Sequence, residues 1–282
     1  MLVVKAYAKV NLTLEVLGKR SDGYHQVATV MQTVDLADEL SFAPSERLLF
    51  RCNLSSLETA DNLVLRAATL LKERTGCDRA AEIRLQKSIP VAAGLGGGSS
   101  DAAATLMALN RMWELALGPD ELHGLAASLG SDVPFFLIGG TALAQGRGEE
   151  VQALPPMRGV HFVLLVPPVE IPQKTATLYG HLNPEHYTRG EVSQRLRECI
   201  EAGNWPDGSL TFNAFEPVAL GLFSAIHDYR RAFLAAGAPW VRLTGTGPGM
   251  YTFVASRDEA EAMADRLRGT GCEPILVSSV NL

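Results

Sequence analysis

Residues 90 to 100 read Pro-Val-Ala-Ala-Gly-Leu-Gly-Gly-Gly-Ser-Ser, and Asp101 and three alanines follow at once. Glycine lacks a Cβ, so other atoms can approach the N–H groups of such a loop. Strand-forming residues lead in over 81–89, and a helix is predicted over 101–117, with Ser99 or Ser100 as its cap. The free N–H groups and the macrodipole of a helix N-terminus favour an anion. The stretch therefore predicts a phosphate-binding loop between a strand and a helix.

A glycine-rich turn that only connects a strand to a helix would have a similar composition. Two common phosphate motifs are excluded, because no lysine follows the glycines as a P-loop requires, and the dinucleotide pattern G-x-G-x-x-G also fails. Counted from Gly94 that pattern meets Ser99, and counted from Gly96 it meets Asp101. The remaining pattern, P-x-x-x-G-L-G-G-G-S-S-[DN]-A-A, resembles the phosphate-binding motif of the GHMP kinases. The resemblance implies an ATP-binding loop made of Pro90, Val91, Ala92, Ala93, Gly94, Leu95, Gly96, Gly97, Gly98, Ser99 and Ser100.

The composition suits a globular protein of two lobes. The chain has 282 residues, of which 47% are hydrophobic and 20% charged. Its formal net charge is −6 and its lysines and arginines form no basic run, so nucleic acid is not an expected partner. The apolar runs fall far short of the ~20 residues that span a bilayer, so no membrane segment is expected. The N-terminus also lacks the apolar core of a signal peptide.

The cysteines are scattered along the chain, at Cys52, Cys77, Cys199 and Cys272. They form no C-x-x-C pair and no cluster with histidine, so a structural zinc site is not expected. A secreted protein of this size could hold two disulfides, but scattered thiols are more typical of a reducing cytosol. We therefore expect free cysteines and a cytoplasmic protein.

Hydrophobic periodicity predicts an α+β fold. Strands are predicted over 2–16, 24–36, 39–52, 81–89, 160–166, 240–244, 250–255 and 274–278, with a hairpin over 139–148. Helices are predicted over 63–75, 101–117, 121–129, 175–182, 191–202, 213–236 and 257–268. Asp61 or Asn62 is expected to cap the first helix and Gly76 to end it. Pro155-Pro156 marks the expected boundary between an N-terminal lobe, 1–155, and a C-terminal lobe, 156–282.

Phosphoryl transfer needs a group that orients or deprotonates the acceptor hydroxyl and a cation that stabilises charge. Asp132 is the leading carboxylate, because it lies at a break in regular structure between Gly130 and Pro134. Lys9, in the first strand, is the leading cation. From spacing alone, a turn-capping aspartate and a solvent-facing strand lysine are the commoner outcomes.

A second resemblance favours the catalytic interpretation. Residues 8–25, A-K-V-N-L-T-L-E-V-L-G-K-R-S-D-G-Y-H, are similar to the opening of the GHMP kinases that act on 4-diphosphocytidyl-2-C-methyl-D-erythritol. The likeness continues through G-S-D-V-P-F-F (130–136) and G-T-G-P-G (245–249). It implies a two-lobed α+β fold with a ferredoxin-like C-terminal lobe, and Lys9 and Asp132 as the catalytic pair. The implied activity is ATP-dependent phosphorylation of the acceptor's 2-hydroxyl, in the non-mevalonate route to isoprenoid precursors.

The same resemblance assigns the ligands. Mg²⁺ is expected with ATP, although no protein ligand for the metal is indicated. Cytosine is expected to stack on Tyr24 and to be read by His25, and Asn11 is also implied in acceptor binding. The family carries a second aromatic four residues after a threonine, which Thr175 and Tyr179 match, although I-P-Q-K (171–174) departs from the usual V-S-T string.

Near the C-terminus, the family places the glycine loop 245–249 beside the first loop. The string N-A-F-E (213–216) departs from the family pattern, so only a structural role is expected for it.

Two alternatives stay open. The first is another small-molecule kinase of the superfamily, acting on homoserine or a mevalonate phosphate, and the stretch 18–25 argues against it. The second is a non-catalytic nucleotide-binding protein, and the presence of both Lys9 and Asp132 argues against that.

Overall fold

The computed structural model describes residues 1–169, 173–204 and 206–281. The chain forms two compact units, each assembled from separate segments. The first unit comprises 1–8, 36–91 and 96–138, and the second comprises 9–35, 92–95 and 139–282. Strands β1 (Leu2–Asn11) and β3 (His25–Ser45) contribute residues to both. The division into lobes at 155/156 stays a prediction.

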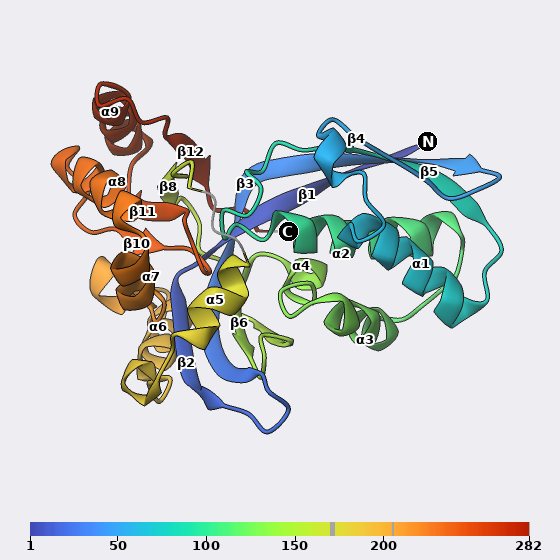
Figure 1. Ribbon diagram of the computed structural model, residues 1–282, viewed down its shortest axis with the longest axis horizontal. Helices are drawn as coiled ribbons and strands as arrows, with labels where there is room; N and C mark the ends of the chain where they lie inside the picture. Colours follow the sequence, from blue (N-terminus) through green and yellow to red (C-terminus); the bar gives the residue numbers. More distant parts are fainter. Residues whose placement is uncertain (170–172, 205, 282) are drawn as a thin grey trace. The chain divides into compact units, whose positions relative to one another are not determined.

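The first unit is a sheet with helices on one face (Figure 1). Strand β4 (Leu49–Cys52) runs parallel to β5 (Ala80–Gln86), and β5 pairs antiparallel with residues 39–45 of β3. The covering helices are α1 (Leu63–Thr75), α2 (Gly97–Met112) and α3 (Pro119–Leu129), and the short α4 (Phe135–Ile138) packs against α2. The buried side chains between helices and sheet include Phe42, Val64, Leu71, Ile83, Leu106 and Leu109.

The ends of α1 follow the prediction, whereas those of α2 do not. The side chain of Asn62 accepts a hydrogen bond from the N–H of Val64 at 2.9 Å, and Gly76 ends α1 with a φ of 66°. Helix α2 begins at Gly97 rather than 101 and ends at Met112 rather than 117. The capping role expected for Ser99 or Ser100 is wrong, because both lie inside the first turn of α2. Gly96 takes the cap position with a φ of 72° and without a side-chain bond.

The second unit contains a mixed sheet in which β3 has several partners. Strand β2 (Thr13–Lys19) pairs antiparallel with β3 and parallel with the short β9 (Phe212–Asn213). Residues 29–32 of β3 pair with β6 (Thr141–Gln145), and β6 pairs with β7 (Glu150–Ala153). The predicted hairpin is therefore present, but it spans 141–153 rather than 139–148, because residues 146–149 form its turn.

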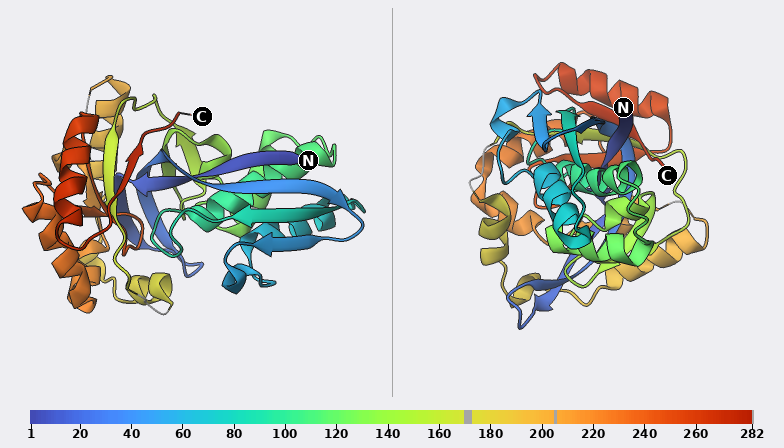
Figure 2. Two further views of the ribbon diagram at one scale, coloured as in Figure 1. Left: turned by 90° about the horizontal axis from the view of Figure 1, so that it is seen from above. Right: turned by 90° about the vertical axis from the view of Figure 1, so that its right-hand side faces the viewer.

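A second sheet in this unit is antiparallel, in the order β10 (Arg242–Leu243), β11 (Met250–Val254), β8 (His161–Leu165) and β12 (Ile275–Ser278). Helices α8 (Ser224–Ala235) and α9 (Arg257–Arg268) lie on one face of it (Figure 2). The chain passes from β8 through helices to β10 and β11, then through α9 to β12. This strand–helix–strand–strand–helix–strand order is the ferredoxin-like arrangement, so the predicted architecture of the C-terminal part is confirmed.

Two predicted elements differ from the structure. Residues 24–36 and 39–52 are not separate groups of strands, because β3 runs unbroken over 21 residues and only β4 follows it. The helix predicted over 213–236 is divided into α7 (Glu216–Leu222) and α8, because Phe223 between them has non-helical angles, φ −126° and ψ 87°. The remaining helices of the second unit are α5 (Lys174–Gly180) and α6 (Glu191–Glu201). Within the described residues, no helix has the length and apolar character needed to cross a membrane.

Candidate functional site

The middle of the glycine loop, residues 92–95, lies in the second unit and uses all its carbonyl oxygens. Two of them bond the other glycine-rich loop or the residue before it. The carbonyl of Ala93 accepts from the N–H of Gly249 at 3.1 Å, and that of Gly94 accepts from the Thr244 hydroxyl at 3.1 Å. The prediction that the loop 245–249 lies near the first loop is therefore confirmed for this segment.

The other two bonding partners are lysines. Leu95 accepts from the backbone N–H of Lys9 at 3.0 Å, and Ala92 accepts from the side chain of Lys174 at 2.6 Å. Across the part of the chain that the structure describes, the N–H groups of 92–95 donate no hydrogen bond. Since backbone donors need partners when they are covered, this segment offers N–H groups to an anion.

Lys9 does not face solvent as an ordinary strand lysine does. Its residue is only 2% exposed, and its Nζ donates to the carbonyl of Gly94 at 3.0 Å and to Oδ1 of Asn11 at 2.5 Å. The flanking Ala8 and Val10 are fully buried. The ammonium is thereby attached directly to the glycine loop, where it can neutralise phosphate charge.

Asn11 fixes the direction of that ammonium. Its Oδ1 also accepts from the N–H of Gly245 at 2.9 Å, while its Nδ2 donates to Thr29 Oγ1 at 2.9 Å. Both ends of the amide are therefore engaged, which sets the oxygen toward Lys9. The role expected for Asn11 in acceptor binding stays a prediction.

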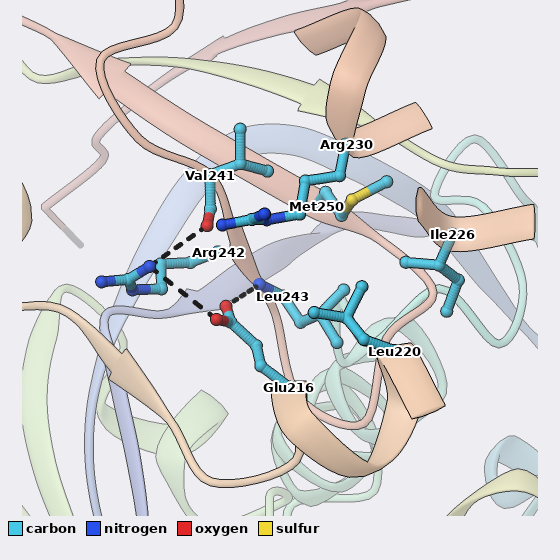
Figure 3. Close-up of a pocket in the computed structure, with 8 residues that line it drawn as sticks. All are labelled: Glu216, Leu220, Ile226, Arg230, Val241, Arg242, Leu243 and Met250. Carbon is cyan, nitrogen blue, oxygen red and sulfur yellow. Dashed lines mark hydrogen bonds and ion pairs between the residues drawn. The ribbon is translucent and has the colours of Figure 1, made fainter. Parts of the chain in front are cut away.

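The residues of N-A-F-E hold the start of the second loop, so their predicted structural role is confirmed. Nδ2 of Asn213 donates to the carbonyls of Leu243 and Gly245, each at 2.8 Å. Oε1 of Glu216 accepts from the N–H of Leu243 at 2.8 Å, and Arg242 lies 3.8 Å from its other oxygen. Both side chains line a small pocket together with Arg230 and apolar residues (Figure 3). Burial raises the pKa of Glu216, which Arg242 opposes.

Of the residues expected around cytosine, His25 contacts Tyr179 and Tyr24 contacts Arg147, both within the second unit. The ring of His25 lies 4.9 Å from that of Tyr179 and 6.2 Å from that of Tyr187. Tyr179 also meets Phe215, at 4.8 Å between ring centres. Burial, followed by the charge of Lys19, lowers the pKa of His25, which favours the neutral imidazole that can both donate and accept.

Tyr24 is 53% exposed and lies in a hairpin loop shaped by Asp22, whose carboxylate accepts from the N–H of Tyr24 at 3.1 Å and pairs with Arg20 at 2.9 Å. The guanidinium carbon of Arg147 lies 4.7 Å from the centre of the Tyr24 ring. Thr175 contacts the second loop, with its Oγ1 3.4 Å from that of Thr246. The structure therefore brings together His25 with Tyr179 and Tyr24 with Arg147, and Arg147 is a residue that the sequence analysis missed.

Asp132 belongs to the first unit, where it lies half-buried in the turn between α3 and α4. The turn begins where the N–H of Val133 donates to the carbonyl of Gly130 at 3.3 Å. The break in regular structure expected at this position is thus present. The pairing of Asp132 with Lys9 stays a prediction.

A buried charged cluster lies under the part of the loop in the first unit. Lys87 bonds Asp38 and also Asp101 in α2, the latter at 2.9 Å, and its side chain is 5% exposed. A Cβ built on Gly97 would come within 3.0 Å of the Lys87 ammonium. Burial raises the pKa of Asp101 to about 7 against the opposing pull of Lys87, and Asp38 adds to the rise. Oδ1 of Asp101 is buried without a hydrogen-bond partner among the described residues.

This cluster predicts a pH-dependent stability. The pKa of Asp101, about 7 in the folded protein, compares with about 3.9 when unfolded, so the folded state binds more protons in between. The stabilisation that protonated Asp101 adds to the folded protein is fully present below pH ~4 and is lost as the pH rises through ~7. Asp101→Asn does not titrate, so relative to wild type it should become more stable by on the order of 1–3 kcal/mol between pH 5 and 8.

Urea unfolding midpoints of both proteins at several pH values measure this difference. Lys87→Met serves as the companion variant, because it removes the cation that opposes the rise and should steepen the pH dependence. Parallel pH profiles of wild type and Asp101→Asn would show that Asp101 ionises normally.

Among the described residues, no group of three or more His, Cys, Asp and Glu side chains could hold a metal ion. The four cysteines are free thiols, as expected.

Comparisons with known proteins agree with this geometry. The family models described as GHMP kinases N terminal domain and GHMP kinases C terminal match residues 62–140 and 189–271. The 4-diphosphocytidyl-2-C-methyl-D-erythritol kinase of Dehalococcoides mccartyi is 43% identical over 281 residues, 99% of each chain. The enzyme of the same name from Pelotomaculum thermopropionicum is 42% identical over 289 residues, covering 99% of this chain and 97% of its own.

Solved structures give the same result. The crystal structure of a 4-(cytidine 5'-diphospho)-2C-methyl-D-erythritol kinase superposes with a TM-score of 0.82 at 33% identity, covering 99% of both chains. A homoserine kinase from Cytophaga hutchinsonii has a TM-score of 0.72 at 19% identity, over 97% of this chain and 95% of its own, which is a likeness of fold alone.

Proposed function

Because this chain belongs to the 4-diphosphocytidyl-2-C-methyl-D-erythritol kinases of the GHMP kinase superfamily, we propose that it transfers the γ-phosphoryl group of ATP to the 2-hydroxyl of 4-diphosphocytidyl-2-C-methyl-D-erythritol. This is a step of the non-mevalonate route to isoprenoid precursors. The observation that carries the proposal is the contact of the buried Lys9 ammonium with the Gly94 carbonyl, which joins a cation to a loop whose N–H groups are available to phosphate.

In the proposed reaction, the loop 90–100 binds the phosphates of ATP through its N–H groups. Asp132 orients the acceptor hydroxyl and accepts its proton while the hydroxyl oxygen attacks the γ-phosphorus. Lys9 stabilises the charge on the phosphoryl oxygens, and Asn11 keeps Lys9 in that direction. ADP leaves as the bond from phosphorus to its bridging oxygen breaks.

We also propose that Mg²⁺ enters as its complex with ATP. Such an ion keeps several waters and binds mainly phosphate oxygens, so it does not need a cage of protein carboxylates. When bound, the ion would neutralise charge between the β- and γ-phosphates.

The acceptor would be held by its cytosine, with Tyr24 stacking on the base and His25 reading its polar edge, and with Tyr179 and Thr175 completing the site from α5 and its start. The partners are thus two small molecules, with no nucleic acid and no membrane. The four free thiols suit a reducing compartment, and we propose the cytoplasm as the location.

A coupled assay of ADP release with a panel of acceptors tests this function. The panel contains 4-diphosphocytidyl-2-C-methyl-D-erythritol, mevalonate, a mevalonate phosphate and homoserine, and ³¹P NMR of the product identifies the phosphorylated oxygen. ADP release with any of the other acceptors but not with the cytidyl compound would refute the assignment, as would release with none.

Tyr24→Ala should raise KM for the cytidyl acceptor by about one to two powers of ten and leave KM for ATP unchanged. Stacking of a base on an aromatic ring contributes ~1–3 kcal/mol, and ~1.4 kcal/mol corresponds to a factor of ten. Steady-state kinetics with each substrate varied in turn measure both constants.

Tyr187→Ala is the control, because Tyr187 is another tyrosine of this unit, with its ring 6.2 Å from that of His25, and no stacking on the base is proposed for it. Its effect on acceptor KM should be smaller. An unchanged acceptor KM in Tyr24→Ala, or an equal rise of both KM values, would remove Tyr24 from the cytosine site.

A further inference from the structure

Lys174, the first residue of α5, connects the two glycine-rich segments of the second unit. Its Nζ donates to the carbonyl of Ala92 at 2.6 Å and also to the carbonyl of Gly247. Lys174 is the last residue of the string I-P-Q-K (171–174), which departs from the family's usual sequence. Residues 170–172 lie outside the described part of the chain. Lys174 itself therefore lies outside the family string, whereas its two acceptors lie in the two glycine-rich motifs.

The carbonyl of Ala92 differs from those of residues 93–95 in the groups that bond it. Ala93, Gly94 and Leu95 are held by backbone groups, by a hydroxyl and by Lys9, whereas Ala92 bonds only Lys174 among the described residues. Ala92 also has a positive φ of 57°, which is uncommon for a residue with a Cβ. A conformation of that kind persists only where its surroundings hold it, and the bond from Lys174 to the Ala92 carbonyl is one such restraint.

We propose that Lys174 is a positioning residue for the phosphoryl donor, whose ammonium ties the Ala92 end of the ATP loop to Gly247 and thereby keeps the N–H groups of 92–95 available to the phosphates. Charge-assisted hydrogen bonds to two carbonyls are stronger than neutral ones, so the charge on the amine matters to the tie. The inference rests on the proposed use of ATP, and ATP affinity measures it without turnover.

The charge of this amine is sensitive to pH in the accessible range. Burial, and then the positive charge of Lys9 on β1, lower the pKa of Lys174 to about 8. The other groups against the ammonium, the Ala92 and Gly247 carbonyls, are neutral acceptors. Above this pH the amine loses its charge and bonds both carbonyls more weakly, so ATP should bind less well.

The test compares Lys174→Met, Lys174→Arg and the wild type in ATP titration calorimetry and in steady-state kinetics. Lys174→Met should weaken ATP binding and raise KM for ATP by about tenfold, with kcat and the acceptor KM changed much less. Lys174→Arg keeps a permanent charge and should restore most of the affinity. In the wild type kcat/KM for ATP should fall above pH ~8, whereas both variants should not show this fall.

Lys72→Met is the matched control. Lys72 in the first unit also donates to two backbone carbonyls, those of Asp78 and Arg79, at 3.4 and 2.9 Å. If this variant weakens ATP binding as much as Lys174→Met, the effect is one of general stability and the inference is wrong.

If Lys174→Met binds ATP as tightly as the wild type, the inference is wrong. It is also wrong if kcat/KM for ATP of the wild type does not fall above pH ~8, and this second measurement does not depend on whether the methionine variant folds. A wild type that binds ATP without phosphorylating the acceptor would refute the proposed function and leave the affinity test of Lys174 valid.

Discussion

Asp132→Asn and Lys9→Met should each lower kcat by about 10²–10⁴-fold at saturating substrates, while both proteins stay folded and still bind ATP. Asparagine keeps the shape of the aspartate but cannot accept the proton of the acceptor hydroxyl. Methionine fills the space of the lysine stem but carries no charge for the transferring phosphoryl group.

The contacts around Lys9 indicate that its loss leaves the loop in place. Gly94 keeps the hydroxyl of Thr244 as a donor, and Oδ1 of Asn11 keeps the N–H of Gly245. Circular dichroism and ATP calorimetry on Lys9→Met therefore serve as the controls. A variant with normal ATP affinity and near-normal kcat would show that Lys9 only supports the loop.

The double variant adds a stricter measurement. If Asp132 and Lys9 act on the same transfer step, the two losses should not multiply, because groups that act as a unit are strongly non-additive. A double variant whose loss equals the product of the single losses would mean that the residues contribute independently.

Local sequence signals predicted much of the fold. The cap at Asn62, the stop at Gly76 and the bounds of α9 follow from residues within one turn of the helix end. The start of α2 was missed because the glycine signal was interpreted as loop, whereas Gly97 and Gly98 take helical angles after the left-handed Gly96. The length of β3 was also missed, because its continuity depends on partners that lie far along the chain, β5 and β6.

The residues of the candidate site likewise differ in whether a local sequence pattern could identify them. The loop, Lys9, Tyr24 and His25 lie in motifs of consecutive residues, so their types and spacing were available from the sequence. Thr244, Arg147 and Lys174 act through contacts with residues 73 to 233 positions away, and no local pattern identifies such partners. The departure of I-P-Q-K from the family string marked the place of Lys174 but not its contact.

Gly94→Ala should lower kcat/KM for ATP by about 100-fold or more. A Cβ on Gly94 would lie 2.0 Å from the carbonyl oxygen of Thr244, far inside any real contact, and 3.3 Å from the nitrogen of Gly247. Both neighbours are backbone atoms, so a side chain cannot rotate away and the two loops must separate. A displacement of ~1 Å at a reaction centre can cost about 10²-fold.

Backbone strain alone would not give this result. Gly94 has a φ of 83°, and an alanine there costs roughly 1–2 kcal/mol of stability whatever surrounds it. Gly203→Ala isolates that cost, because Gly203 has a φ of 71° and no atom within 4 Å of a built Cβ. We expect Gly203→Ala to lower the unfolding midpoint and to keep kcat/KM, and Gly94→Ala to lose both. Equal kcat/KM in the two variants would mean that the close approach of the two loops is not needed to bind the nucleotide. In that case the carbonyl contacts of 92–95 would be a feature of the fold, and the phosphates would depend on the helix side of the loop, residues 96–100.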